Sequence, residues 1–159
     1  MSSFTTPLVA EFEDDGIHYV IWQMFAFMIG ALGTGIGVSV PVGFRTDLAS
    51  VPWWIRWLLP PNGKYGKAAV IHDYLCVYRK VMVGSEAVYI TREMCDHIFF
   101  EAMEVLKVPS WQKWSMFLAV RAYAKATGID REDQKKAKEN PNYFTDVYAM
   151  GAFVASYAD

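Results

Sequence analysis

Hydrophobic positions divide the chain into a β-type first third and a helical remainder. Residues 18–29 and 36–42 are two runs rich in β-branched and aromatic side chains, and residues 30–35 between them carry the glycines of a chain reversal. Both runs are apolar on both faces. We therefore expect an antiparallel hairpin with one face against helices and the other against a partner or the N-terminal arm. That arm, residues 1–10, is predicted to be an extended segment or an edge strand.

Apolar residues recur at helical spacing through most of the remaining chain. The pattern predicts helices over residues 49–59, 65–78, 91–107 and 111–127. Gly128 is expected to end the last of these helices, because glycine readily adopts the left-handed conformation that closes a helix. Together these elements predict an α+β fold, in which about four helices pack on a small antiparallel sheet.

The character of the chain changes near residue 130. Residues 130–142 are charged and poor in apolar side chains, whereas residues 143–157 are apolar again. A polar spacer before an apolar end predicts an extended C-terminal tail that docks on its own core or on a neighbouring subunit. We therefore divide the chain into a compact α+β domain, residues 1–129, and a spacer with a docking tail, residues 130–159.

Composition excludes several classes of protein. A chain of 159 residues with 53% hydrophobic and 20% charged residues is long and apolar enough to form one folded domain. Its net charge of −2 argues against a nucleic-acid binder that relies on bulk positive charge. The N-terminus lacks the pattern of a signal peptide. The apolar stretch 17–44 contains glycines and Pro41 that would interrupt a membrane-spanning helix. Cys76 and Cys95 are interpreted as reduced, buried thiols.

His72 and Asp73 are the strongest candidates for chemistry. They lie in the middle of a predicted helix, within an apolar run, where both need polar partners if they are buried. Adjacent helix positions point about 100° apart, so one is expected to contact a ligand while the other anchors a neighbour. We expect Asp73 to form an ion pair with Arg92 or Arg121.

Asp47 and Asp96 complete the candidate set. Asp47 follows a predicted strand, Asp96 lies in an apolar helix stripe, and either is expected to orient His72. His72, Asp47 and Asp96 form a suitable ligand set for a divalent metal ion. With Asp73, the same residues suit general acid–base catalysis. The alternative is a purely structural polar network. No named metal-binding motif is matched.

Three separated motifs resemble one known family. They are VPVGFRTDLASVP at residues 40–52, AAVIHDYL at residues 68–75, and Arg92 followed by Asp96. In this order they resemble a bacteriophage and prophage family known only as domain of unknown function 1353, over about residues 38–121. The resemblance implies a phage or prophage origin but no established activity. It marks as a common site Thr46, Asp47, Ser50, His72, Asp73, Arg92 and Asp96.

Two functions from different classes follow from these patterns. The first is a virion or assembly component that binds other phage structural proteins or its own copies, in the particle or in the host cytoplasm during assembly. The alternative is a small hydrolase, metal-dependent or not, that acts on the bacterial cell envelope through the His/Asp site. We place the first slightly ahead because no complete catalytic signature is present. A third option is an inhibitor of a host enzyme or defence system.

Overall fold

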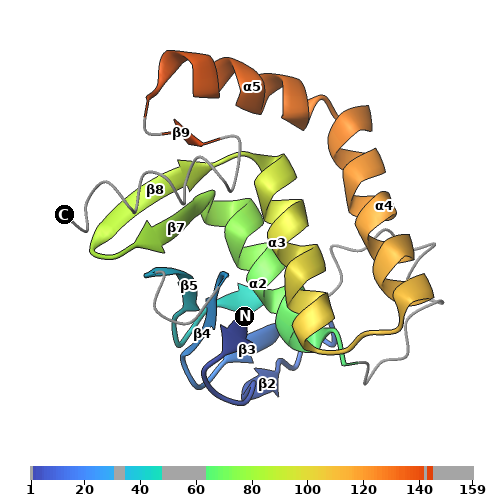
Figure 1. Ribbon diagram of the computed structural model, residues 1–159. Coiled ribbons are helices and arrows are strands. Elements are labelled where there is room, and N and C mark those ends of the chain that lie inside the picture. The colour runs from blue at the N-terminus through green and yellow to red at the C-terminus, as the bar shows by residue number, and fades with distance from the viewer. Residues whose placement is uncertain (1, 31–34, 48–63, 142, 145–159) are drawn as a thin grey trace.

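Two β-sheets and four helices make up the part of the chain that the computed structural model describes (Figure 1). That part is residues 2–30, 35–47, 64–141, 143 and 144. This architecture confirms the predicted α+β fold. The predicted helix at 49–59 with Ser50, the centre of the glycine turn and the tail beyond residue 144 lie outside the described residues.

The larger sheet contains the predicted hairpin. Its strand order is β1 (Ser3–Phe4), β4 (Phe25–Met28), β5 (Ile36–Val40), β7 (Lys80–Val83), β8 (Glu86–Ile90) and β9 (Tyr143–Phe144). The first five strands are antiparallel, and β9 runs parallel to β8. Phe25 lies opposite Val40, as an antiparallel hairpin requires, and the N-terminal arm supplies the edge strand β1. Both predictions are confirmed.

The long first strand is in fact two strands in different sheets. We expected one strand over residues 18–29, but β3 (Tyr19–Ile21) pairs with β2 (Ala10–Phe12) and β6 (Arg45–Thr46) in a second sheet. The chain leaves this sheet at Trp22 and enters the larger one at β4. The Ile21 and Trp22 amides donate to the Phe44 and Val9 carbonyls, so backbone pairing ties the chain to the neighbours of β3 as far as Trp22.

The hairpin formed by β7 and β8 was not predicted. Val81 and Val83 are buried while Met82 between them is exposed, which is the alternation of a strand with one covered face. Gly84 forms the turn with a φ of 59°, a conformation that favours glycine. The alternation and the glycine were both visible in the sequence, so this hairpin was predictable.

Helix α2 (Gly66–Tyr78) packs on the larger sheet, and the later helices pack on one another and on α2. These later helices are α3 (Arg92–Val105), α4 (Ser110–Ala126) and α5 (Ile129–Glu139). Figure 1 shows α2 and α3 side by side, with α4 beside α3 and α5 following α4. The Thr91 side chain caps α3 by accepting the Met94 amide at 3.3 Å. The predicted helices at 65–78, 91–107 and 111–127 are confirmed.

Helix α5 corrects the interpretation of residues 130–142 as a spacer. Gly128, with a φ of 77°, ends α4 as predicted and at once begins α5. The helix resembled a spacer because only Asp133 among its residues is buried. Its charges suit the helix dipole, with acidic residues in the first turn and lysines in the last. The division of the chain at residue 129 stays a prediction. Among the described residues, no helix has the length and apolarity to cross a membrane.

The aromatic core of the larger sheet yields a stability prediction. Phe27 in β4 is fully buried, and its ring centroid lies 4.7 Å from that of Phe4 in β1. Phe27→Ala should lower the free energy of unfolding by about 3–5 kcal/mol, because it leaves a cavity where a large side chain packed. Urea denaturation measures this. The exposed Met24→Ala should change it by no more than about 0.5 kcal/mol, and equal effects of the two would contradict this assignment of the core.

Candidate functional site

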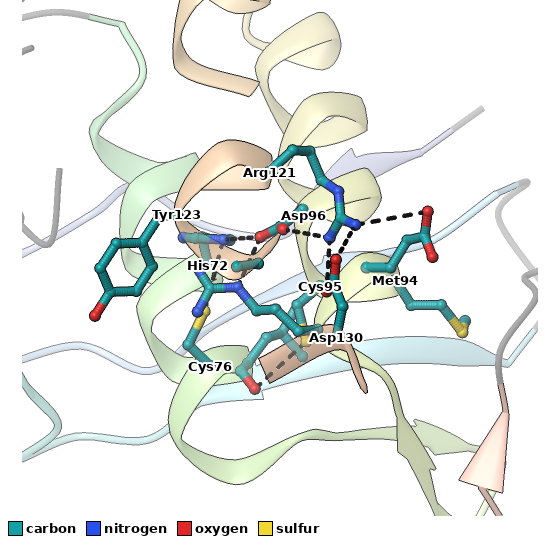
Figure 2. Close-up of polar contacts among 12 residues, drawn as sticks. His72, Cys76, Met94, Cys95, Asp96, Arg121, Tyr123 and Asp130 are labelled. Atoms are coloured by element: carbon teal, nitrogen blue, oxygen red, sulfur yellow. Dashed lines mark hydrogen bonds and ion pairs between the residues drawn. The ribbon is translucent and has the colours of Figure 1, made fainter. Parts of the chain in front are cut away.

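Three helices converge on the carboxylate of Asp96, which is wholly buried. His72 Nε2 from α2 lies 2.6 Å from Asp96 Oδ1, and Arg92 Nε donates to the same oxygen at 2.9 Å. Arg121 Nη1 from α4 donates to Asp96 Oδ2 at 3.0 Å (Figure 2). We call these four residues the Asp96 cluster. Asp96 is thus one of the two aspartates expected to orient His72, and it contacts His72 directly.

Local helix geometry explains how these side chains meet. Arg92 and Asp96 are four residues apart in α3, so they lie on the same face one turn from each other. The His72 ring stacks on Phe99 of the same helix, with 4.6 Å between ring centroids. Arg121 is missing from the motifs that the sequence singled out. Its place in the cluster depends on how α4 packs on α3, which periodicity does not specify.

Helix α5 supports the cluster with two aspartates that sequence reasoning missed. Arg121 Nη2 donates to Asp130 Oδ2 at 2.6 Å (Figure 2). Asp133 accepts the backbone amide of Arg92 at 2.6 Å, which places its negative charge at the N-terminus of α3. Asp133 also pairs with Arg79 at the end of α2. The charged stretch that resembled a spacer therefore holds α2, α3 and α4 together.

The interactions within the Asp96 cluster shift the pKa values of both Asp96 and His72. Burial raises the pKa of Asp96, but the hydrogen bond and positive charge of His72, together with Arg92, outweigh burial and hold that pKa below its usual range. Burial lowers the pKa of His72, yet its interactions with Cys76 and with the Asp96 carboxylate raise that pKa to about 9. At neutral pH His72 is therefore an imidazolium. It is suited to hold position or to donate a proton, and unsuited to act as a base.

A pocket of about 1050 Å³ opens beside the cluster. Residues from five separated stretches of sequence line it, and they include Thr46, Asp47, His72, Asp73, Cys76, Arg92 and Tyr123. Four of the predicted site residues therefore share this pocket with Arg92: Thr46, Asp47, His72 and Asp73. Asp96 is not among its lining residues and lies behind His72 and Arg92. Ser50 lies outside the described residues.

Asp73 takes a different role from the one predicted. We expected an ion pair with Arg92 or Arg121, but both arginines bind Asp96 instead. Asp73 Oδ2 accepts a hydrogen bond of 2.5 Å from the Thr46 hydroxyl, which links α2 to the end of β6. The reason is the offset between adjacent helix positions: His72 faces α3, so Asp73 faces β6 and the pocket.

The pKa of the Asp73 carboxyl group is unusually high. Burial raises its pKa to about 6, against the opposing hydrogen bond from Thr46, and the negative charge of Asp47 adds to the increase. A carboxyl with a pKa near 6 exchanges protons under mild conditions. Such a group in a pocket, with a named physical cause for the shift, marks a candidate for acid–base chemistry.

The structure does not favour the predicted metal site of His72, Asp47 and Asp96. Both oxygens of Asp96 already accept hydrogen bonds from cationic side chains. A divalent ion there would have to displace a guanidinium group and lie beside an imidazolium. In the described part of the chain, closely grouped ligand atoms occur at Glu13, Asp15 and His18, where Arg45 already pairs with both carboxylates.

Cys76 was predicted to be a reduced, buried thiol, and its burial was overestimated. It is partly exposed, lines the pocket, and its Sγ lies 3.6 Å from His72 Nε2. The i, i+4 spacing of His72 and Cys76 in a predicted helix was the signal that placed both on one face. Cys95 is buried, as predicted, with its Sγ 3.5 Å from the Leu75 carbonyl oxygen.

Comparison with known proteins finds one family and one curated relative. A family model described as "Protein of unknown function (DUF1353)" matches residues 29–120, which is more than half of the chain. An uncharacterized protein, y4jT, of Sinorhizobium fredii is 35% identical over 91 residues, covering 56% of this chain and 24% of the relative. The chain therefore spans about a quarter of the length of the curated relative it matches. No solved structure matches.

The charge state of His72 yields a pH-dependence prediction. Its pKa in the folded protein exceeds the ordinary value of 6.5. Protonation therefore adds stability that is fully present below about pH 6.5 and is lost as the pH rises through about 9. Between pH 6 and pH 9.5, the unfolding free energy of the wild type should fall more steeply than that of His72→Gln, as measured by urea denaturation. Parallel pH profiles for the two proteins would contradict a raised pKa.

Proposed function

This chain belongs to the DUF1353 family of proteins of unknown function, and we propose that it is a small hydrolase that acts on a glycan of the bacterial cell envelope. One observation carries the proposal: the pocket wall presents Asp73, a carboxyl whose pKa is raised to about 6, close enough to Asp47 to feel its negative charge. A phage or prophage origin, as the motifs imply, fits such a substrate because a phage crosses the envelope at entry and at lysis.

Two carboxyl groups with different protonation are the pair that glycoside hydrolysis uses. Asp73 in its acid form would donate a proton to the oxygen of the leaving sugar. Asp47, the second carboxyl of the pocket wall, would activate the attacking water or stabilise the positive charge that develops on the sugar ring. The Thr46 hydroxyl, which bonds the Asp73 carboxyl, would hold it in position for the transfer.

The Asp96 cluster has a positioning role in this proposal. Asp96 holds His72 and Arg92 at the back wall of the pocket. Asp96 itself takes no part in proton transfer, because its carboxylate is wholly buried. His72, being cationic, is adjacent in sequence to Asp73, and its charge lowers the pKa of that carboxyl. Through the charge of His72, the Asp96 cluster would therefore lower the pKa of Asp73.

Asp73→Asn tests the role of the proton donor. On purified peptidoglycan sacculi the wild type should release reducing sugar ends, and the variant should be slower by about 100-fold or more because the amide cannot donate the proton. Since the acid form of Asp73 disappears as the pH rises through about 6, the wild-type rate should fall above that pH.

The matched control is Glu86→Gln, which removes an exposed carboxyl on β8 away from the pocket and should leave the rate unchanged. Thermal unfolding of both variants establishes that they are folded. A folded Asp73→Asn protein with wild-type activity, or a wild type that releases no sugar ends from sacculi or other envelope glycans, would contradict the proposal.

A second candidate function, assembly of a phage particle, is favoured by a different surface. Trp111, Trp114 and Leu118 are each at least half exposed, and their spacing places them on one face of α4. Exposed apolar stripes of this kind mark protein-binding surfaces. In this case the partners would be phage structural proteins or further copies of the chain, in the virion or in the host cytoplasm during assembly.

Quantitative mass spectrometry of purified particles tests this second candidate. If the chain is a structural component, particles from the encoding strain should contain it at a fixed copy number. Leu118→Asp should remove it from the particles, because burying the new charge in an interface is unfavourable. A Glu86→Gln chain should be incorporated normally. Particles that lack the wild-type chain would contradict an assembly role.

A further inference from the structure

The guanidinium group of Arg92 is only partly used by the protein. Its Nε donates to Asp96, whereas no hydrogen bond from Nη1 or Nη2 to a described residue is present. The side chain is nine-tenths buried, with 10% of its surface exposed, and it lines the pocket. The two Nη nitrogens, which together carry four N–H donors, therefore have no hydrogen-bond partner among the described residues, and Arg92 lines the pocket where a ligand can meet them.

Other pocket cations differ from Arg92 in this respect. Arg45 is ion-paired with Glu13 and Asp15, and Arg79 with Asp133. For Arg92, the described residues place no carboxylate other than that of Asp96 within 4.0 Å of the guanidinium nitrogens. A suitable acceptor that enters the pocket can therefore bind the Nη atoms without displacing a described protein partner.

We propose that Arg92 is the recognition residue for an anionic oxygen group of the ligand, a carboxylate or a phosphate, that enters the pocket beside Asp73. A planar guanidinium presents paired N–H donors that match the two oxygens of such a group. Asp96 holds the side chain through Nε and Asp133 holds the backbone amide of Arg92, so little freedom is lost on binding. The residue is thereby built into the fold as a preorganised anion site.

This inference deepens the proposed hydrolase function by naming a feature of the substrate. Envelope glycans carry two such groups: the carboxylates of peptidoglycan, on the peptide stem or on N-acetylmuramic acid where that stem has been removed, and the phosphodiester of teichoic acids. Arg92 would bind a carboxylate or a phosphate through the same N–H donors. Which of the two anions binds therefore indicates which of the two polymers is the substrate. Asp73 and Arg92 line the same pocket, which places the anion near the bond to be cleaved.

Ligand titrations followed by two-dimensional NMR test the site without relying on catalysis. The probes are N-acetylmuramic acid, glycerol 3-phosphate and the neutral N-acetylglucosamine. One of the two anions should bind measurably tighter than the neutral sugar and shift the Arg92 Nε signal. Arg92→Lys keeps the charge but loses the paired donors, so it should weaken binding by about tenfold or more. The control Arg45→Lys alters another arginine of the pocket and should bind as the wild type does.

A second variant keeps the test decisive if Arg92→Lys does not fold. Ala122 is exposed on α4 and lines the pocket, so Ala122→Trp narrows the pocket without touching the Asp96 cluster. It should also weaken anion binding. Equal binding of all three probes, or anion binding that survives in folded Arg92→Lys or in Ala122→Trp, would overturn the inference. Anion binding in a protein without hydrolase activity would overturn only the proposed function, and hydrolysis without anion binding would overturn only the site.

Discussion

The rest of the site depends on the interactions between the buried carboxylate of Asp96 and its cationic partners. It has no access to water, and three cationic side chains from α2, α3 and α4 compensate its charge. A buried ion pair stabilises a fold only when its geometry satisfies every group, and removing one partner leaves an uncompensated charge. The arrangement therefore fixes the three helices relative to one another and specifies where the back wall of the pocket lies.

Two neighbouring residues of α2, His72 and Asp73, have different surroundings. His72 faces α3 and becomes part of a saturated, cationic network, whereas Asp73 faces β6 and retains a carboxyl group that titrates near pH 6. Arg92 links the two regions because its Nε belongs to the network and the residue also lines the pocket. A single frame thus places the Asp73 carboxyl and the Arg92 guanidinium at the same pocket.

Periodicity in the sequence predicted the elements that pack by one apolar face, namely the hairpin of β4 and β5 and the helices α2, α3 and α4. It missed α5, because this helix buries one aspartate and is held by charges. The convergence of His72 with Asp96 was also predictable from buried polar residues that need partners. The choice of Asp96 over Asp73 as the partner of Arg92 and Arg121 was not, because it depends on helix packing that no local pattern encodes.

A double-mutant cycle between His72 and Asp96 tests the central claim most directly. The four proteins are the wild type, His72→Gln, Asp96→Asn and the double variant, and urea denaturation at pH 7 gives their unfolding free energies. If the pair is a charged, buried contact, the two substitutions should be coupled by about 1 kcal/mol or more. Additive effects of the two substitutions, with a coupling energy near zero, would contradict the account.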